Sequence, residues 1–259
     1  MIDVHCHISA EEFASDRELM IQGAQEVGVK AIVAVCEFPK DFSIVLELST
    51  RYPGFIHPCV GAHPVQEGNR SVSLKEFEKT EEFVRQNAKL LVGIGEVGLD
   101  FTPYIIKSPK DKEIQREVFK RQIQLAKDFS LPLNVHSRSA GRPVIDILIQ
   151  EGAKDVVLHA FDGKPSVAMK GVDAGYFFSV PPSVIRSEQK QRLIKQIPLA
   201  NLLLETDAPA LGPVKQERNE PKNIEISCRE ISKIKNISVA HVIEETTKNA
   251  LRLFDRLSR

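Results

Sequence analysis

Six side chains that commonly bind metal ions lie along this chain, each near the end of a strand-like segment. They are four imidazoles and two carboxylates: His5, His7, His136, His159, Glu96 and Asp207. At each position an apolar run gives way to polar, loop-forming sequence. In an eight-stranded α/β barrel the active site lies at this end of the strands. The repetition of the pattern predicts that the six side chains converge on one metal centre.

The first two histidines are separated by one residue. Residues two apart on a strand point to the same face, so His5 and His7 face one side and Cys6 the other. The same alternation places Asp3 on the inward face, one layer below His5. A buried carboxylate there could accept a proton from a metal-binding imidazole, as a supporting residue of the site. A capping role at the start of the strand is the alternative interpretation for Asp3.

Glu96 stands in an apolar, glycine-rich segment, where an unpaired carboxylate would be costly to bury. Metal coordination explains its position, because a carboxylate can bridge two cations. His136 and His159 each close an apolar strand. Imidazole suits zinc, iron, copper and nickel, and added carboxylates extend the tolerance to manganese and magnesium.

The last strand ends in two carboxylates that share a face. Asp207 lies nearer the rim and is the candidate ligand or general base, while Glu205 is expected to support it from below. His63 closes the third strand and is interpreted as a contact to a substrate phosphate. Arg138, two positions beyond His136, could hold a phosphate with its planar guanidinium.

The elements that must position these residues alternate between strand and helix. Eight short apolar runs read as strands covered on both faces. They are residues 2–7, 31–37, 55–63, 90–100, 132–137, 155–161, 175–180 and 202–209. Helical spacing and capping residues indicate helices between and after them. These are residues 9–27, 71–88, 110–129, 142–151, 165–173, 187–197, 222–235 and 238–257.

Eight such units predict an α/β fold with right-handed crossovers, closed as a (β/α)8 TIM barrel. An open doubly wound sheet is the alternative, but no glycine-rich GxGxxG follows the first strand to support it. The irregular segment 208–221 follows the final strand and is expected to be a loop on the rim of the site.

Bulk properties narrow the function. The 259 residues suit one barrel domain spanning 1–259. The 35 basic residues balance the 35 acidic ones, so no global field draws the protein to nucleic acid or membranes. No apolar run is long enough to span a bilayer. Four scattered cysteines and no secretory signal favour the cytoplasm, with the nucleus open.

With these residues in hand, the sequence resembles the TatD family of metal-dependent deoxyribonucleases, from the first strand to the final helix. The resemblance is carried by DVHCH (3–7), GAHP (61–64), GEVGLD (95–100), NVHSR (134–138), HAFDG (159–163), ETDAPAL (205–211) and RNEP (218–221). It implies an amidohydrolase-like barrel with two divalent cations: zinc, magnesium or manganese. One cation would be held by His5, His7, Glu96 and Asp207, and the other by Glu96, His136 and His159.

The resemblance also implies metal-assisted hydrolysis of DNA phosphodiester bonds. We expect Asp207 to take the proton from the attacking water and Glu96 to bridge the cations. The family implies 3′-exonuclease action on single-stranded DNA, and apurinic-site cleavage is a further expectation. DNA is thus the expected partner, with no membrane and no obligatory protein partner. Three aromatic residues near strand ends could stack on a base: Phe101, Tyr104 and Phe161.

Two other functions fit the same residues. The first is an amidohydrolase or lactonase that uses the same metals on a C–N or ester bond. Many such barrels carry a carboxylated lysine as the metal bridge, where this chain offers Glu96, so the nuclease is favoured. The second is a non-catalytic barrel that keeps metal for stability. The complete set of ligands argues against it.

Overall fold

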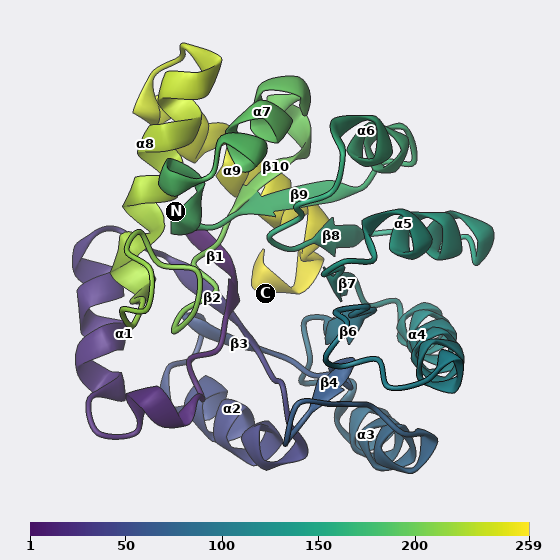
Figure 1. The fold of residues 1–259 in the computed structure, drawn as a ribbon. Helices are drawn as coiled ribbons and strands as arrows, with labels where there is room; N and C mark the ends of the chain where they lie inside the picture. Colours follow the sequence, from purple (N-terminus) through teal and green to yellow (C-terminus); the bar gives the residue numbers. More distant parts are fainter. Residues whose placement is uncertain (259) are drawn as a thin grey trace.

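Parallel strands surrounded by helices make up the computed structural model, which describes residues 1–258 (Figure 1). Eight strands occupy the predicted positions. They are β1 (Ile2–Cys6), β2 (Ala31–Val35), β3 (Ile56–Cys59), β6 (Ile94–Gly98), β7 (Leu133–His136), β8 (Val156–Leu158), β9 (Phe177–Val180) and β10 (Leu202–Leu204). Each is short and buried on both faces, apart from the half-buried His57 in β3. This is the pattern that the continuous apolar runs predict.

Backbone hydrogen bonds close these strands into a barrel. The strands pair in parallel in two runs, β1–β2–β3 and β6–β7–β8–β9–β10. One junction is a bridge between Cys59 and Gly93, just ahead of β6. At the other junction the amide of Asp207 donates to the carbonyl of His5 at 2.9 Å, and the amide of His7 donates to the carbonyl of Ala208 at 2.9 Å. The expected (β/α)8 barrel is therefore confirmed.

Helices α1 to α8 surround the barrel in the order in which the chain runs, and α9 passes behind the strands toward the centre (Figure 1). They are α1 (Arg17–Glu26), α2 (Pro39–Arg51), α3 (Leu74–Asn87), α4 (Pro109–Phe129), α5 (Gly141–Gln150), α6 (Pro165–Asp173), α7 (Glu188–Gln196), α8 (Ile224–Lys235) and α9 (Val239–Leu253). The structure corrects the expected helix 9–27, which is a short 3-10 turn, Glu11–Phe13, followed by α1. None of these helices is long and apolar enough to cross a membrane.

Helix α2 and the hairpin of β4 and β5 were not predicted from the sequence. Helix α2 buries Phe42, Val45 and Leu48 at intervals of three residues, so its helical signal was present in the sequence. The hairpin of β4 (Val65–Gln66) and β5 (Arg70–Ser71) is too short to leave a periodic pattern. It follows β3 and forms one wall of the cavity that is described below.

Two apolar layers hold the barrel. The larger lies between the strands and the outer helices, and includes Cys6, Ile32 and Leu204. The smaller fills the barrel and joins inward-facing residues such as Val33 and Leu203 to the end of α9. Residues Ala250, Leu253 and Phe254 of this second layer lie at the C-terminal end of α9. This apolar filling leaves the carboxyl ends of the strands for polar groups.

Candidate metal centre

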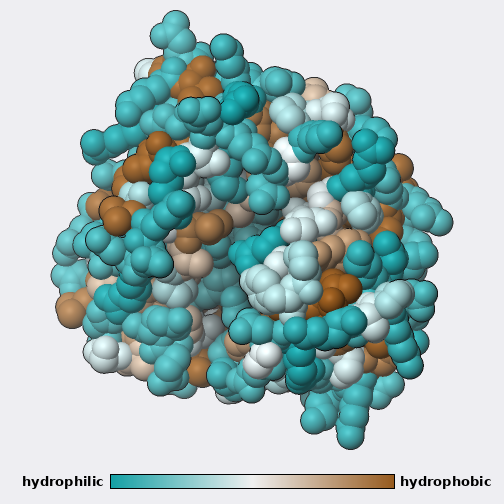
Figure 2. All heavy atoms as spheres, in the orientation of Figure 1, coloured by the Kyte–Doolittle hydropathy of each residue, from teal (hydrophilic) through white to brown (hydrophobic). Residues whose placement is uncertain are grey.

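The six predicted ligands meet at the carboxyl ends of the strands. His5 lies in β1, Glu96 in β6 and His136 at the end of β7, while His7, His159 and Asp207 directly follow β1, β8 and β10. All six are buried, with at most 7% of any of them exposed. Five of them line a cavity of about 270 Å³: His7, Glu96, His136, His159 and Asp207. The face seen in Figure 2 is hollowed near its middle.

Four atoms that could bind a metal ion, from residues in or next to three strands, form the first group. The Nε2 atom of His5 lies 3.2 Å from His7 Nε2 and 3.4 Å from both Glu96 Oε2 and Asp207 Oδ1. His7 Nε2 lies 3.3 Å from the same two carboxylate oxygens. Metal–ligand bonds of about 2.1 Å in a tetrahedral site separate the ligand atoms by about 3.4 Å. The spacing of this group therefore fits a small divalent cation.

The orientation of His5 supports the same fit. The amide nitrogen of Asn134 donates to the carbonyl of Val4 at 2.8 Å, so the carboxamide oxygen is the atom that faces His5. That oxygen lies 2.8 Å from His5 Nδ1 and can only accept, which places the proton on Nδ1. In the neutral ring the lone pair of Nε2 then points at two carboxylates. Such an arrangement requires a positive charge between them, either a proton or a cation.

The second group surrounds the other oxygen of Glu96. Its Oε1 atom lies 2.6 Å from His136 Nδ1, 2.8 Å from His159 Nε2 and 3.4 Å from His63 Nε2. On its far side His136 donates from Nε2 to Asp100, at 3.0 Å, so its Nδ1 lone pair also faces Glu96. The two oxygens of Glu96 thus serve two separate groups, which is the geometry expected of a bridging carboxylate.

Glycines allow β6 to bring Glu96 this close to its neighbours. A Cβ atom added to Gly95 would lie 2.6 Å from the Cβ of Asn134 and 3.0 Å from the Sγ of Cys59. A side chain at Gly95 would therefore force β6 away from β7. This close approach is what the glycine-rich segment around Glu96 indicates.

Charges in the site are strongly coupled. Burial favours neutral imidazoles, but contacts with Asp207 and Glu96 outweigh it and raise the pKa of His7 to about 10. Contacts with Asp100 and Glu96 likewise overcome burial and raise the pKa of His136 to about 9. Burial would raise the pKa of Glu96, but the surrounding histidines hold it well below its usual range. Protons thus balance the carboxylates here, and binding of a cation would release them.

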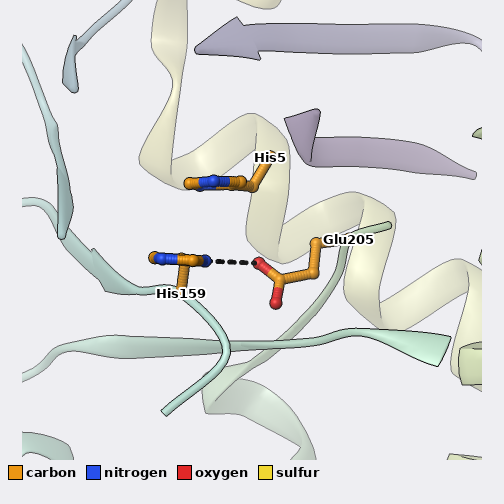
Figure 3. Close-up of side chains that lie close together, drawn as sticks. All are labelled: His5, His159 and Glu205. Carbon is orange, nitrogen blue, oxygen red and sulfur yellow. Dashed lines mark ion pairs between the residues drawn. The ribbon is translucent and has the colours of Figure 1, made fainter. Parts of the chain in front are cut away.

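Glu205 lies next to His159, one of the six candidate ligands. Figure 3 shows His5 and His159 stacked, with ring centroids 3.8 Å apart, and Glu205 facing His159 across 3.8 Å. The carboxylate accepts from the amide of Ala160 at 2.9 Å and from the hydroxyl of Ser179 at 2.5 Å. Burial raises the pKa of Glu205 to about 8. These contacts support the loop that carries His159.

Asp3 makes different contacts from those expected. A register shift in β1 between Asp3 and Cys6 breaks the alternation, and Val4 packs with the inward-facing residues. The carboxylate of Asp3 accepts from the amide of His5 at 3.2 Å, and from the amide and hydroxyl of Thr206 at 3.0 and 2.6 Å. The interpretation that Asp3 accepts from a metal-binding imidazole was wrong. Asp3 instead fixes the backbone of β1 to that of the chain after β10.

The two candidate phosphate contacts differ in position. His63 is buried, and its Nε2 atom lies in the second group beside Glu96 and His136. It can therefore serve as a ligand as well as a phosphate contact. Arg138 is exposed and lines the same cavity. Its guanidinium remains the candidate for binding phosphate.

Sequence reasoning missed Asn134 and Asp100, which orient the rings of His5 and His136. Both lie within motifs that carry the family resemblance, and each is a buried polar residue in or beside an apolar strand. The cost of burying such a group without a partner is the signal that could have identified them.

Buried imidazoles and carboxylates gathered at the carboxyl ends of a (β/α)8 barrel define a metal-dependent hydrolase. Comparison with known proteins specifies the family. The chain belongs to the TatD related DNase family, whose sequence pattern matches residues 2–255. This family confirms the enzyme class that the sequence predicts, a metal-dependent hydrolase of the deoxyribonuclease type.

Relatives from several kingdoms are similar over almost the whole chain. The chain is 54% identical to human "Deoxyribonuclease TATDN3", covering 99% of this chain and 95% of that protein. It is 34% identical to the "Uncharacterized metal-dependent hydrolase YabD" of Bacillus subtilis, covering 98% of each. The crystal structure of the TatD homologue YjjV from Escherichia coli superimposes with a TM-score of 0.88 at 26% identity, covering 98% of each chain.

Proposed function

We propose that this protein hydrolyses phosphodiester bonds of DNA with two divalent cations held at the mouth of the barrel. The observation that carries the proposal is the position of Glu96, whose two oxygens face two separate groups of ligating atoms. His5, His7 and Asp207 would complete the first site. His136 and His159 would complete the second, with His63 next to them.

Each residue of the site has a distinct task in this mechanism. Bound divalent cations neutralise phosphate charge and lower the pKa of water. Burial would raise the pKa of Asp207, but its contacts with His5 and His7 hold that pKa well below its usual range. An unprotonated carboxylate would then face the attacking water, and it could take up a proton from that water once the cations have lowered the pKa of the water. Asn134 and Asp100 hold the imidazoles of His5 and His136 in the orientation that binding requires.

The substrate would reach this centre through the cavity. Arg138 lines the cavity from the loop after β7, where its planar guanidinium can bind the non-bridging oxygens of a phosphate. The 3′ end of single-stranded DNA and the phosphate beside an abasic residue both present an accessible phosphodiester. We therefore propose exonuclease action on single strands, with cleavage at abasic sites as a related activity.

The deciding experiment is cleavage of end-labelled single-stranded DNA and of abasic duplex in the presence of magnesium, manganese or zinc. The wild type should cleave, and Glu96→Ala should lose at least about 100-fold in rate, because the bridging group is gone. Glu113→Gln on the exposed face of α4 is the matched control and should remain active. Full activity of Glu96→Ala would refute the assignment.

A parallel panel of lactones and cyclic amides separates the remaining functions. Turnover of these compounds without cleavage of DNA would favour an amidohydrolase or lactonase. Binding of metal without turnover of any substrate would favour a non-catalytic barrel. Metal content measured on the same samples makes the three outcomes distinct.

A further inference from the structure

Three aromatic residues near the strand ends have different environments. Phe161 is buried, with 3% exposed, and packs edge-on against Phe178 at 5.4 Å between centroids. Phe101 is half-buried, and its ring is covered by Lys112 and Arg116 of α4, at 5.2 and 5.1 Å. Neither ring is available to a ligand in the cavity.

Tyr104 is the exception among these three. It is 56% exposed and lines the cavity together with His136, Asp100 and Arg138. An exposed aromatic ring and a cationic side chain that line the same cavity are the combination that holds single-stranded nucleic acid. The cation binds the backbone, while the ring stacks on a base.

The loop that carries Tyr104 is fixed relative to the metal ligands. Asp100 accepts from the amide of Thr102 at 2.9 Å and from the ring of His136 at 3.0 Å. The carbonyl of Thr102 in turn accepts from the amide of Ile105 at 2.9 Å, and the side chain of Ile105 is buried. One carboxylate therefore ties both His136 and this loop in place. The backbone that carries Tyr104 is therefore held close to the centre where phosphate would bind.

We propose that Tyr104 is the stacking platform for a base of the bound strand, next to the phosphate that is cleaved. This inference rests on the proposed function, since it requires a nucleic-acid substrate. A platform of this kind tolerates every base, because each base offers a π-face. Tyr104 would thus discriminate between nucleotides that carry a base and abasic ones, without selecting a sequence.

The test compares two oligonucleotides of equal length and charge. One is oligothymidine, and the other carries abasic tetrahydrofuran residues in place of its last two nucleotides. Tyr104→Ala should lower kcat/KM on oligothymidine by about 5- to 100-fold, mainly through KM. On the abasic strand it should match the wild type. Tyr104→Phe should restore activity on oligothymidine, because the ring is retained.

Leu90→Ala, an exposed apolar residue outside this cavity, is the matched control and should leave both substrates unaffected. Equal losses on both strands would show a structural role, and no loss on either would show no role. Either result overturns the inference while the wild type still cleaves DNA. Failure of the wild type to cleave any DNA overturns the proposed function and this inference with it.

Discussion

At the scale of single residues, the site depends on which nitrogen each imidazole turns inward. Asn134 accepts from Nδ1 of His5, and Asp100 accepts from Nε2 of His136. Each contact leaves the opposite nitrogen facing Glu96. In a neutral ring of this orientation, a nitrogen lone pair faces a carboxylate, and the two repel each other. A cation bound between them would remove this repulsion.

Replacing Asn134 with Ala should weaken binding of manganese or zinc by about 10- to 100-fold, because His5 loses the partner that orients its ring. Isothermal titration calorimetry measures the affinity. Asn87→Ala removes a comparable amide, which donates to the carbonyl of Phe83 within α3, and should bind metal as the wild type does. Unchanged affinity in Asn134→Ala would mean that the amide has no orienting role.

At the scale of elements, irregularities decide which side chains enter the site. The register shift in β1 turns Asp3 away from the barrel interior, while His5 still points toward the other candidate ligands. Asp207 follows β10 with a φ of 55°, a left-handed conformation that is uncommon for aspartate. Regular strands would place the carboxylates at other positions. Strain of this kind is often found at functional sites.

Helix α3 offers a test of pH dependence away from the metal centre. Glu76 is bonded to Arg70 and to the capping residue Ser73, and the contact with Arg70 lowers its pKa to about 2. Because this pKa is lower in the folded state than the ordinary value of 4.5, ionised Glu76 stabilises the fold at pH values above 4.5. This contribution is lost as the pH falls toward 2. Glu76→Gln should cost about 1 kcal/mol at pH 7, and less as the pH decreases.

Urea unfolding at pH 7, 5 and 3.5 measures this difference. Glu78→Gln changes an exposed residue on the same helix, and the described part of the chain provides no ion-pair partner for Glu78. This control should show no such trend. A difference for Glu76→Gln that stays constant across this range would contradict the assigned ion pair.

At the scale of the whole molecule, the candidate metal centre and the closure of the barrel share residues. The backbone of His5, His7 and Asp207 joins the first strand to the end of the last. The side chains of the same residues form the first group of ligating atoms. Binding at this group should therefore stabilise the closed barrel, because a ligand that binds only the folded state adds to its stability.

Titrating manganese or zinc into metal-free protein should raise Tm with concentration, by about 5–10 °C at a hundredfold excess over Kd. Differential scanning calorimetry follows the transition. Glu96→Gln removes a charge shared by both groups and should lose most of the rise. If the protein binds metal and its Tm does not change, metal binding does not stabilise the closed barrel, and the prediction is wrong.

The order of the elements and most of the site could be read from the sequence, because apolar runs and their ends are local signals. The runs located the eight strands, and the polar residues at their ends are the six candidate ligands that the structure brings together. Helix α2 carried such a signal without being predicted. The two-residue strands of the β4–β5 hairpin carried none.

Only the tertiary structure decided how these residues act together. Alternation along β1 could not place Asp3, because the register shift depends on pairing with β2. The inward nitrogen of His5 depends on Asn134, which is 129 residues away along the chain. The strands and the candidate ligands at their ends are thus determined by local sequence. The ring nitrogen that each histidine turns inward, the groups that the two oxygens of Glu96 contact and the exposure of Tyr104 depend on contacts between residues far apart in the chain.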